Sequence, residues 1–237
     1  MSELAAAGRV TVILFWTMLA LMPGAAAQGL NPPLIIGHII IDDAQVTAYI
    51  PRILGSSPTE IRPEIVEKVN QAILRKAKLD LASFRADWDG FVRTAPEHTR
   101  KHLHYWMSYA VKLNREKLLS LTIEEYYYTG GAHGDGRVWG LSFDLESGRS
   151  IKLADVFKPG ADFHGRLESL IRSEIARRGL TKYWFDGIKN DQQFYLTEEG
   201  LVIYFQPYEI APWVYGVPRF IVSYQELSDI LNPRLRF

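Results

Sequence analysis

The spacing of apolar positions along the chain changes several times, and each change marks a predicted element. Residues 34–53 form an apolar, β-branched run with two aspartates near its middle, which predicts two strands joined by a turn or one long bulged strand. Residues 62–84 place apolar side chains about every 3.6 positions after Pro63, which predicts a helix. We expect the charges on its other face to be solvated: Glu67, Lys68, Arg75, Lys76 and Lys78. The polar, irregular segment 86–101 is interpreted as a seam between two units.

The second half of the chain repeats these two patterns. Alternation over 105–113, 118–128 and 138–145 predicts three antiparallel strands in a meander. A second amphipathic helix is predicted from Phe163 until Gly179 ends it, followed by strands over 194–196, 201–206 and 220–222. Ser223 and Glu226 have the capping-box spacing, which predicts a short closing helix to about Leu231.

Strands grouped apart from helices predict an α+β fold with antiparallel sheet and two main helices. We expect residues 28–101 to form an amino-terminal α/β unit that packs on a carboxy-terminal α+β unit, residues 102–237. The chain is long enough to bury a substantial core, and it contains no cysteine, so disulfides cannot stabilise it.

The first 27 residues have the three parts of a secretory signal peptide. Arg9 precedes an apolar stretch from Val10 to Met22, and small residues lead to a predicted cleavage site after Ala27. The apolar stretch is shorter than the roughly 18–20 residues needed to span a bilayer, which favours cleavage over an uncleaved anchor. Without an amino-terminal cysteine for lipid attachment, we expect a periplasmic or extracellular protein with no membrane anchor after cleavage.

The formal net charge of the chain is zero, which argues against nucleic acid and anionic lipid as binding partners. Lys plus Arg and Asp plus Glu both number 27, and this neutral balance gives no general attraction to nucleic acid or to anionic lipid. Aromatic residues make up 12% of the chain, including 12 Tyr and 6 Trp. Tyr and Trp carry a polar tip on an apolar body, so they serve either at binding surfaces or half-buried in sheets.

A glycine-rich segment, residues 129–136, is the most distinctive motif. Glycines permit positive φ, and consecutive amides turned inward can hold an anion or a carbonyl oxygen. The alternative is a hairpin loop whose glycines serve only for turning. The segment lacks the Lys and the Ser or Thr of a phosphate-binding P-loop. Its candidate ligand-binding residues are Thr129, Gly130, Gly131, His133 and Gly134.

A second candidate segment, residues 207–216, combines prolines with aromatic residues. The prolines stiffen it and lower the entropy cost of presenting Tyr208, Trp213 and Tyr215 to a partner. Glu209 could pair with His133 as a general acid or base if the two loops meet. The alternative is a packing role in which Glu209 holds backbone amides of the glycine-rich segment.

Other chemistry has little support in the sequence. His98 and His102 have the i, i+4 spacing of two metal ligands and His104 is near, but no supporting helix pattern or His-Glu-x-x-His motif is present. There is no cysteine nucleophile and no Gly-x-Ser-x-Gly elbow. We therefore expect neither a metal nor another cofactor.

The motif Tyr128–Gly134 resembles the extracellular domain family of unknown function shared by the lysozyme-sensing anti-sigma factor RsiV and the peptidoglycan deacetylase PdaC. The family pattern continues through Asp144–Gly148, Leu153–Phe157 and Tyr208–Pro212 with Gly216. The resemblance covers about residues 35–231 and implies an α+β domain that binds a protein or glycan in a cell-wall setting.

Two departures limit what the resemblance implies. Nine residues precede the apolar segment in this sequence, so we expect neither the sigma-binding domain of the anti-sigma factor nor a deacetylase domain. We therefore expect a non-catalytic binding protein that recognises a wall-associated protein such as lysozyme, or a peptidoglycan fragment. The alternatives are an envelope hydrolase using His133 and Glu209, and a structural subunit with a large exposed apolar patch.

Overall fold

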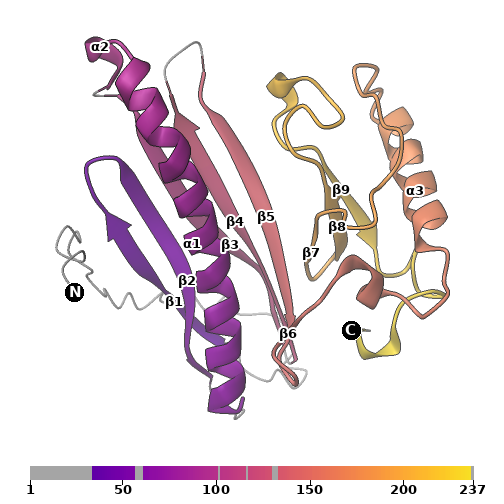
Figure 1. Ribbon diagram of the computed structural model, residues 1–237. Coiled ribbons are helices and arrows are strands. Elements are labelled where there is room, and N and C mark those ends of the chain that lie inside the picture. The colour runs from indigo at the N-terminus through magenta and orange to yellow at the C-terminus, as the bar shows by residue number, and fades with distance from the viewer. Residues whose placement is uncertain (1–33, 57–60, 101, 116, 130–132, 236–237) are drawn as a thin grey trace, which may run out of the picture.

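The computed structural model describes residues 34–56, 61–100, 102–115, 117–129 and 133–235, which form two sheets and two main helices (Figure 1). The signal peptide predicted over residues 1–27 lies outside the described residues. None of the described helices is both long enough and apolar enough to cross a membrane.

The larger sheet has six strands in sequence order: β1 (Leu34–Asp42), β2 (Val46–Ser56), β3 (His104–Arg115), β4 (Leu118–Tyr128), β5 (Asp135–Asp144) and β6 (Arg149–Ser150). Neighbouring strands are antiparallel except β2 and β3, which pair in parallel. A parallel pair needs a long crossover, and helix α1 supplies it. The two strands and the meander expected from the alternating positions are confirmed.

Helix α1 (Pro63–Thr94) lies across one face of this sheet. Its buried side chains recur at helical spacing: Ile65, Val69, Ile73, Ala77, Leu81 and Trp88. Four of them, Val69, Ile73, Ala77 and Leu81, pack on side chains of strands β2 to β5. The helix continues ten residues beyond the expected end, so the interpretation of segment 86–101 as irregular was wrong. Trp88 is 3% exposed and stacks near Phe84, which extends the buried face. Ala95 is extended before Pro96, and the short helix α2 (Glu97–Arg100) follows.

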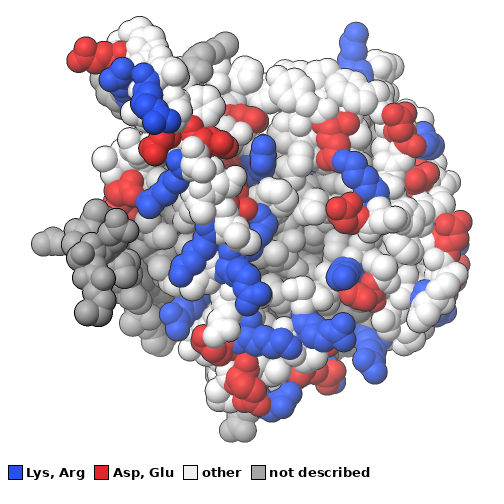
Figure 2. Space-filling model, viewed as in Figure 1, with Lys and Arg blue, Asp and Glu red and all other residues white. Residues whose placement is uncertain are grey.

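The outer face of α1 is charged. Glu67, Lys68, Arg75 and Lys78 are exposed, as expected, and Figure 2 shows Lys and Arg interspersed with Asp and Glu over the surface. Lys76 differs from the expectation: it is only partly exposed, forms an ion pair with Asp80, and lies over the ring of Trp139 in β5.

The smaller sheet has three antiparallel strands, β7 (Phe194–Leu196), β8 (Gly200–Tyr204) and β9 (Arg219–Ser223). Helix α3 (Phe163–Arg177) packs Leu167 and Ile171 against its core, and Asp162 caps it by accepting a 2.9 Å hydrogen bond from the Gly165 amide. Single 3-10 turns occur at Leu153–Val156, Trp213–Tyr215 and Pro233–Leu235.

The prediction of a closing helix after Ser223 was wrong. The capping contacts form, with Ser223 Oγ donating to Glu226 Oε2 at 2.6 Å, but residues 224–230 make consecutive turns. Their backbone bonds are mostly of the i to i+3 type, such as Ile230 to Leu227 at 2.9 Å. Leu227 and Leu231 are buried in these turns.

Buried polar groups join the two sheets. Ser120 Oγ in β4 lies 2.8 Å from Ser142 Oγ in β5 and accepts a 2.9 Å hydrogen bond from the amide of Leu196 in β7. The predicted α+β class with largely antiparallel sheet is confirmed. The predicted unit boundary at residue 101 falls between α2 and β3, within one continuous six-stranded sheet; the division of the chain there stays a prediction.

Candidate functional site

The two loops singled out in the sequence meet through His133 and Trp213. The rings stack with centroids 4.0 Å apart and an interplanar angle of 20°. His133 lies just before β5 and is exposed, and Trp213 begins the 3-10 turn that precedes β9. Both segments lie at the upper end of the molecule in Figure 1. Segments eighty residues apart therefore share one surface.

The end of the β4–β5 hairpin holds His133 in place. A Cβ atom at Gly134 would lie 2.3 Å from the hydroxyl end of the Tyr126 side chain, so any other residue there would require Tyr126 to move. The hydroxyl of Tyr127 donates to Asp135 Oδ2 at 3.1 Å. His133 Nδ1 lies 2.8 Å from the carbonyl oxygen of Gly134, which fits a tautomer protonated on Nδ1. Gly130 and Gly131, two predicted ligand-binding residues, lie outside the described residues.

Glu209 is engaged away from His133. Its Oε1 accepts a 2.7 Å bond from Lys189 Nζ, and its Oε2 accepts a 2.8 Å bond from the Gln206 amide. This carboxylate raises the pKa of Lys189. Trp184 Nε1 donates to the Glu209 carbonyl oxygen at 3.1 Å. Within the described part of the chain, no hydrogen bond or ion pair joins Glu209 to His133, and the contacts that do form hold the 207–216 loop together.

Exposed apolar side chains occur on the 207–216 loop and at Trp184, which is hydrogen-bonded to that loop. The exposed fractions are 58% for Tyr208, 79% for Val214, 42% for Tyr215 and 47% for Trp184. We call this set, with His133 and Trp213, the aromatic surface. Sequence reasoning missed Trp184, because segment 180–193 has no helical or alternating pattern that distinguishes it; two adjacent aromatics at 183 and 184 were the available signal.

The backbone of the 207–216 loop is constrained. Tyr208 has φ of 67°, a left-handed conformation that costs a bulky residue about 1–2 kcal/mol. Gly216, with φ of 63°, ends the 3-10 turn. The ring of Tyr215 meets Tyr183 edge-on, with centroids 5.3 Å apart. These contacts fix the direction in which the loop presents its aromatic side chains.

The three clustered histidines do not share one helical face. His98 lies in α2, which ends at Arg100, before His102. His104 lies in β3, where its Nε2 is 3.1 Å from Thr47 Oγ1 and its ring lies 4.2 Å from that of Trp106. No group of three or more His, Asp or Glu side chains in the described ranges is arranged to hold a metal ion.

Comparison with known proteins places these segments in two family regions. Residues 42–135, from the last residue of β1 to the first residue of β5, match the family model described as deacetylase PdaC. Residues 154–225 match the one described as a protein of unknown function, DUF3298. The chain is an RsiV- and PdaC-like domain of unknown function. The resemblance inferred from the motifs is confirmed, and the His133–Trp213 stack joins one family region to the other.

Two proteins of Bacillus subtilis are similar in sequence. The chain is 22% identical to the anti-sigma-V factor RsiV over 242 residues, covering 92% of this chain and 80% of RsiV. It is 23% identical to the peptidoglycan-N-acetylmuramic acid deacetylase PdaC over 174 residues, covering 70% of this chain. It spans 37% of the length of PdaC.

Two solved structures of DUF3298 family members have the same fold. The protein from Pseudomonas aeruginosa has a TM-score of 0.65 and 20% identity, covering 87% of this chain and 98% of that one. The protein from Bacteroides fragilis has a TM-score of 0.63 and 17% identity, covering 86% and 95%. At identities of 17% and 20%, these similarities show the fold of this chain and nothing about its function.

Proposed function

We propose that this protein is a binding module of the cell envelope that uses the aromatic surface to recognise a wall-associated protein such as lysozyme, or a peptidoglycan fragment. Export through the predicted signal peptide is part of the proposal. The similarity to a peptidoglycan deacetylase and to RsiV indicates association with the envelope and supports this setting.

The stack of His133 on Trp213 carries the proposal. It joins two loops into one surface on which aromatic rings are exposed although their backbone is constrained. Rigid aromatic side chains lose little entropy on binding, which is why Tyr and Trp are enriched at binding hot spots. Flat rings also suit the apolar faces of sugars.

The contacts of Glu209 favour binding over hydrolysis. A general base must reach the proton it removes, and both Glu209 oxygens accept bonds from Lys189 and the Gln206 amide. A hydrolase that used His133 and Glu209 would first have to break these contacts. The binding function requires no such rearrangement.

The proposal is tested by titrating the protein with a lysozyme and with purified muropeptides in a calorimeter. We expect binding to at least one of them, and Trp213→Ala should weaken it by about tenfold or more if Trp213 is a hot spot. Tyr49→Ala is the matched control, because Tyr49 is 40% exposed and lies on β2, outside the aromatic surface. No binding to either probe, or an equal loss in both variants, would refute the proposal.

A further inference from the structure

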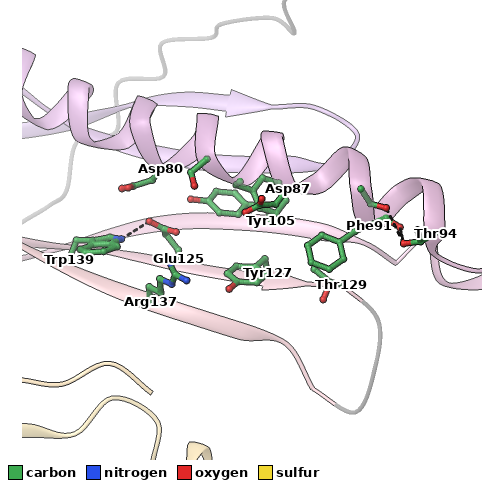
Figure 3. Close-up of a pocket in the computed structure, with 13 residues that line it drawn as sticks. Asp80, Asp87, Phe91, Thr94, Tyr105, Glu125, Tyr127, Thr129, Arg137 and Trp139 are labelled. Carbon is green, nitrogen blue, oxygen red and sulfur yellow. Dashed lines mark hydrogen bonds between the residues drawn. The ribbon is translucent and has the colours of Figure 1, made fainter. Parts of the chain in front are cut away.

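A pocket of about 530 Å³ lies between α1 and strands β3 to β5 (Figure 3). Its lining includes Thr129, one of the predicted ligand-binding residues, but neither His133 nor Trp213. Its size is within the range of small-molecule sites. One wall is helical and the other is the sheet, and aromatic rings from both sides line it. Its polar and indole-bearing lining includes Asp80, Asp87, Tyr105, Glu125, Arg137 and Trp139.

Two polar atoms in the wall of the pocket have no hydrogen-bond partner. Tyr105 is fully buried, and its hydroxyl points towards the carboxylates of Asp80 and Glu125 without forming a hydrogen bond (Figure 3). The second oxygen of Asp80, Oδ2, is also buried and unpaired. A buried polar group without a partner is unfavourable by about 1–3 kcal/mol, so such groups mark strain or a missing ligand.

The charges that face the pocket are mostly negative. Asp80 and Asp87 come from α1 and Glu125 from β4, whereas Arg137 on β5 and Lys76 beside Asp80 are the positive groups among the described residues. Burial, with a further contribution from Asp80, raises the pKa of Glu125 to about 7. Burial and these same carboxylates also raise the pKa of Tyr105. Three carboxylates therefore face two cationic groups around the pocket, and Glu125 carries a full negative charge only above its raised pKa.

One ammonium group of the protein itself, that of Lys76, already lies beside this pocket. Lys76 Nζ forms an ion pair with Asp80 Oδ1 and lies 3.5 Å from the ring centroid of Trp139. Trp139 Nε1 in turn donates to Glu125 Oε1 at 2.6 Å, as the dashed line in Figure 3 shows. A cation over an indole ring and next to a carboxylate is a favourable arrangement. It uses only one of the two Asp80 oxygens.

We propose that this pocket binds the primary ammonium group of a small organic ligand, placed among Asp80, Glu125 and Tyr105. Rotation of the Asp80 carboxylate turns its free oxygen to the pocket, where the ammonium donates to it and to Glu125. The Tyr105 hydroxyl accepts a third bond. The apolar body of the ligand packs on Phe84, Phe91 and Tyr127, the aromatic side chains that line the same space. Three donors on one ammonium match these three oxygens.

The test uses two matched pairs of probes that differ in the amine: glucosamine against N-acetylglucosamine, and pentylamine against pentan-1-ol. Each is titrated into the full chain by calorimetry, and the indole N–H signal of Trp139 is followed by NMR. We expect at least one amine to bind about tenfold or more tightly than its neutral counterpart, since it makes charge-assisted bonds. Equal binding within both pairs, or no binding by either amine, would overturn the proposal.

Tyr105→Phe separates binding from folding. It removes an unpaired buried hydroxyl, so we expect the free energy of unfolding to stay equal or to rise, while amine affinity falls severalfold. Asp80→Asn should lower amine affinity further, although it also frees Lys76. Asp89→Asn is the control, because Asp89 is exposed on α1 and does not line the pocket. Unchanged amine affinity in Tyr105→Phe and Asp80→Asn would refute the site.

The pocket and the aromatic surface share no residue, although Thr129, from the same glycine-rich segment as His133, lines the pocket. Tyr105→Phe should therefore leave lysozyme or muropeptide binding unchanged, and Trp213→Ala should leave amine binding unchanged. Amine binding that is lost in Trp213→Ala but kept in Tyr105→Phe would place the amine on the aromatic surface and overturn the assignment to the pocket.

Discussion

The backbone amide of Gly140 in β5 donates a 2.6 Å hydrogen bond to the hydroxyl oxygen of Tyr204 in β8, so that one phenol joins the two sheets. Tyr204 is fully buried. Its hydroxyl hydrogen has two acceptors within reach, the Val138 carbonyl oxygen and Gln193 Oε1, each at 3.2 Å.

Replacing Tyr204 with Phe should destabilise the protein by about 1–3 kcal/mol, since the Gly140 amide then loses its partner in a largely buried place. Urea unfolding monitored by circular dichroism measures the change. Tyr49→Phe, on an exposed tyrosine in β2, is the control and should change the free energy of unfolding by less than about 0.5 kcal/mol. Equal effects of the two substitutions would contradict the assigned role of Tyr204.

Gly140→Ala should be more damaging. A Cβ atom there would lie 2.0 Å from the backbone carbonyl oxygen of Phe194 in β7, so one sheet must move away from the other. We expect a loss of more than about 2 kcal/mol, or failure to fold. Gly90→Ala provides the opposite control: it lies in α1 with open space around its Cβ, and should stabilise by up to about 1 kcal/mol. A tolerated Gly140→Ala would show that the sheets are not tightly apposed there.

Glu125 should make stability fall as the pH rises. Burial and Asp80 raise its pKa from 4.5 to about 7, so between these values the folded protein holds a proton that the unfolded chain releases. Stability is therefore greatest below the unfolded value and is lost as the pH rises through the folded one. Glu125→Gln should remove this loss, about 1–2 kcal/mol after allowing for solvent screening. Unfolding free energies at about pH 4 and about pH 8 measure it.

Trp139→Phe provides the companion measurement. It removes the hydrogen bond that lowers the pKa of Glu125, so that pKa should rise further. Titration of the Glu125 carboxyl carbon by NMR reports the change directly. A fall in this pKa, or a flat pH dependence of stability in the unsubstituted protein, would show that Glu125 is better solvated than its surroundings indicate.

The elements that were predicted correctly are those whose buried side chains recur at regular spacing within their own segment of the sequence. Strands β3, β4 and β5 alternate because one face of each packs under α1, and the first turns of α1 repeat Ile65, Val69 and Ile73. The last ten residues of α1 carry little of this signal, since Trp88 alone is buried among them. A contact with Phe84 and the sheet sustains the helix there, and periodicity cannot report it.

The candidate sites depended even more on tertiary contacts. Glycine and proline density singled out the two loops, but no local pattern pairs His133 with Trp213 rather than with Glu209, because Lys189 competes for the carboxylate from another segment. The pocket under α1 was not predicted as a site, although Thr129, which lines it, was among the predicted ligand-binding residues. Asp80, Tyr105 and Glu125 come from three elements, and each looks ordinary in its own segment.

Tyr208 should show a conflict between stability and binding. Among the described residues, it is the one non-glycine residue with positive φ. Its ring is 58% exposed, so packing of the side chain offsets little of the free-energy cost of this backbone conformation. Asparagine tolerates this conformation better than tyrosine does. Tyr208→Asn should therefore raise the free energy of unfolding by about 0.5–1 kcal/mol. It should also weaken binding of the lysozyme or muropeptide probe, since it removes a ring from the aromatic surface.

Tyr215→Asn is the matched control for that conflict. Tyr215 also belongs to the aromatic surface, but its φ is not positive and its ring meets Tyr183 edge-on. The substitution should weaken binding and also lower stability, because a packed aromatic pair is lost without any relief of backbone strain. If Tyr208→Asn lowered stability as Tyr215→Asn does, the exposed ring of Tyr208 would have to be a structural contact. Its strained backbone would then give no support to a role in recognition.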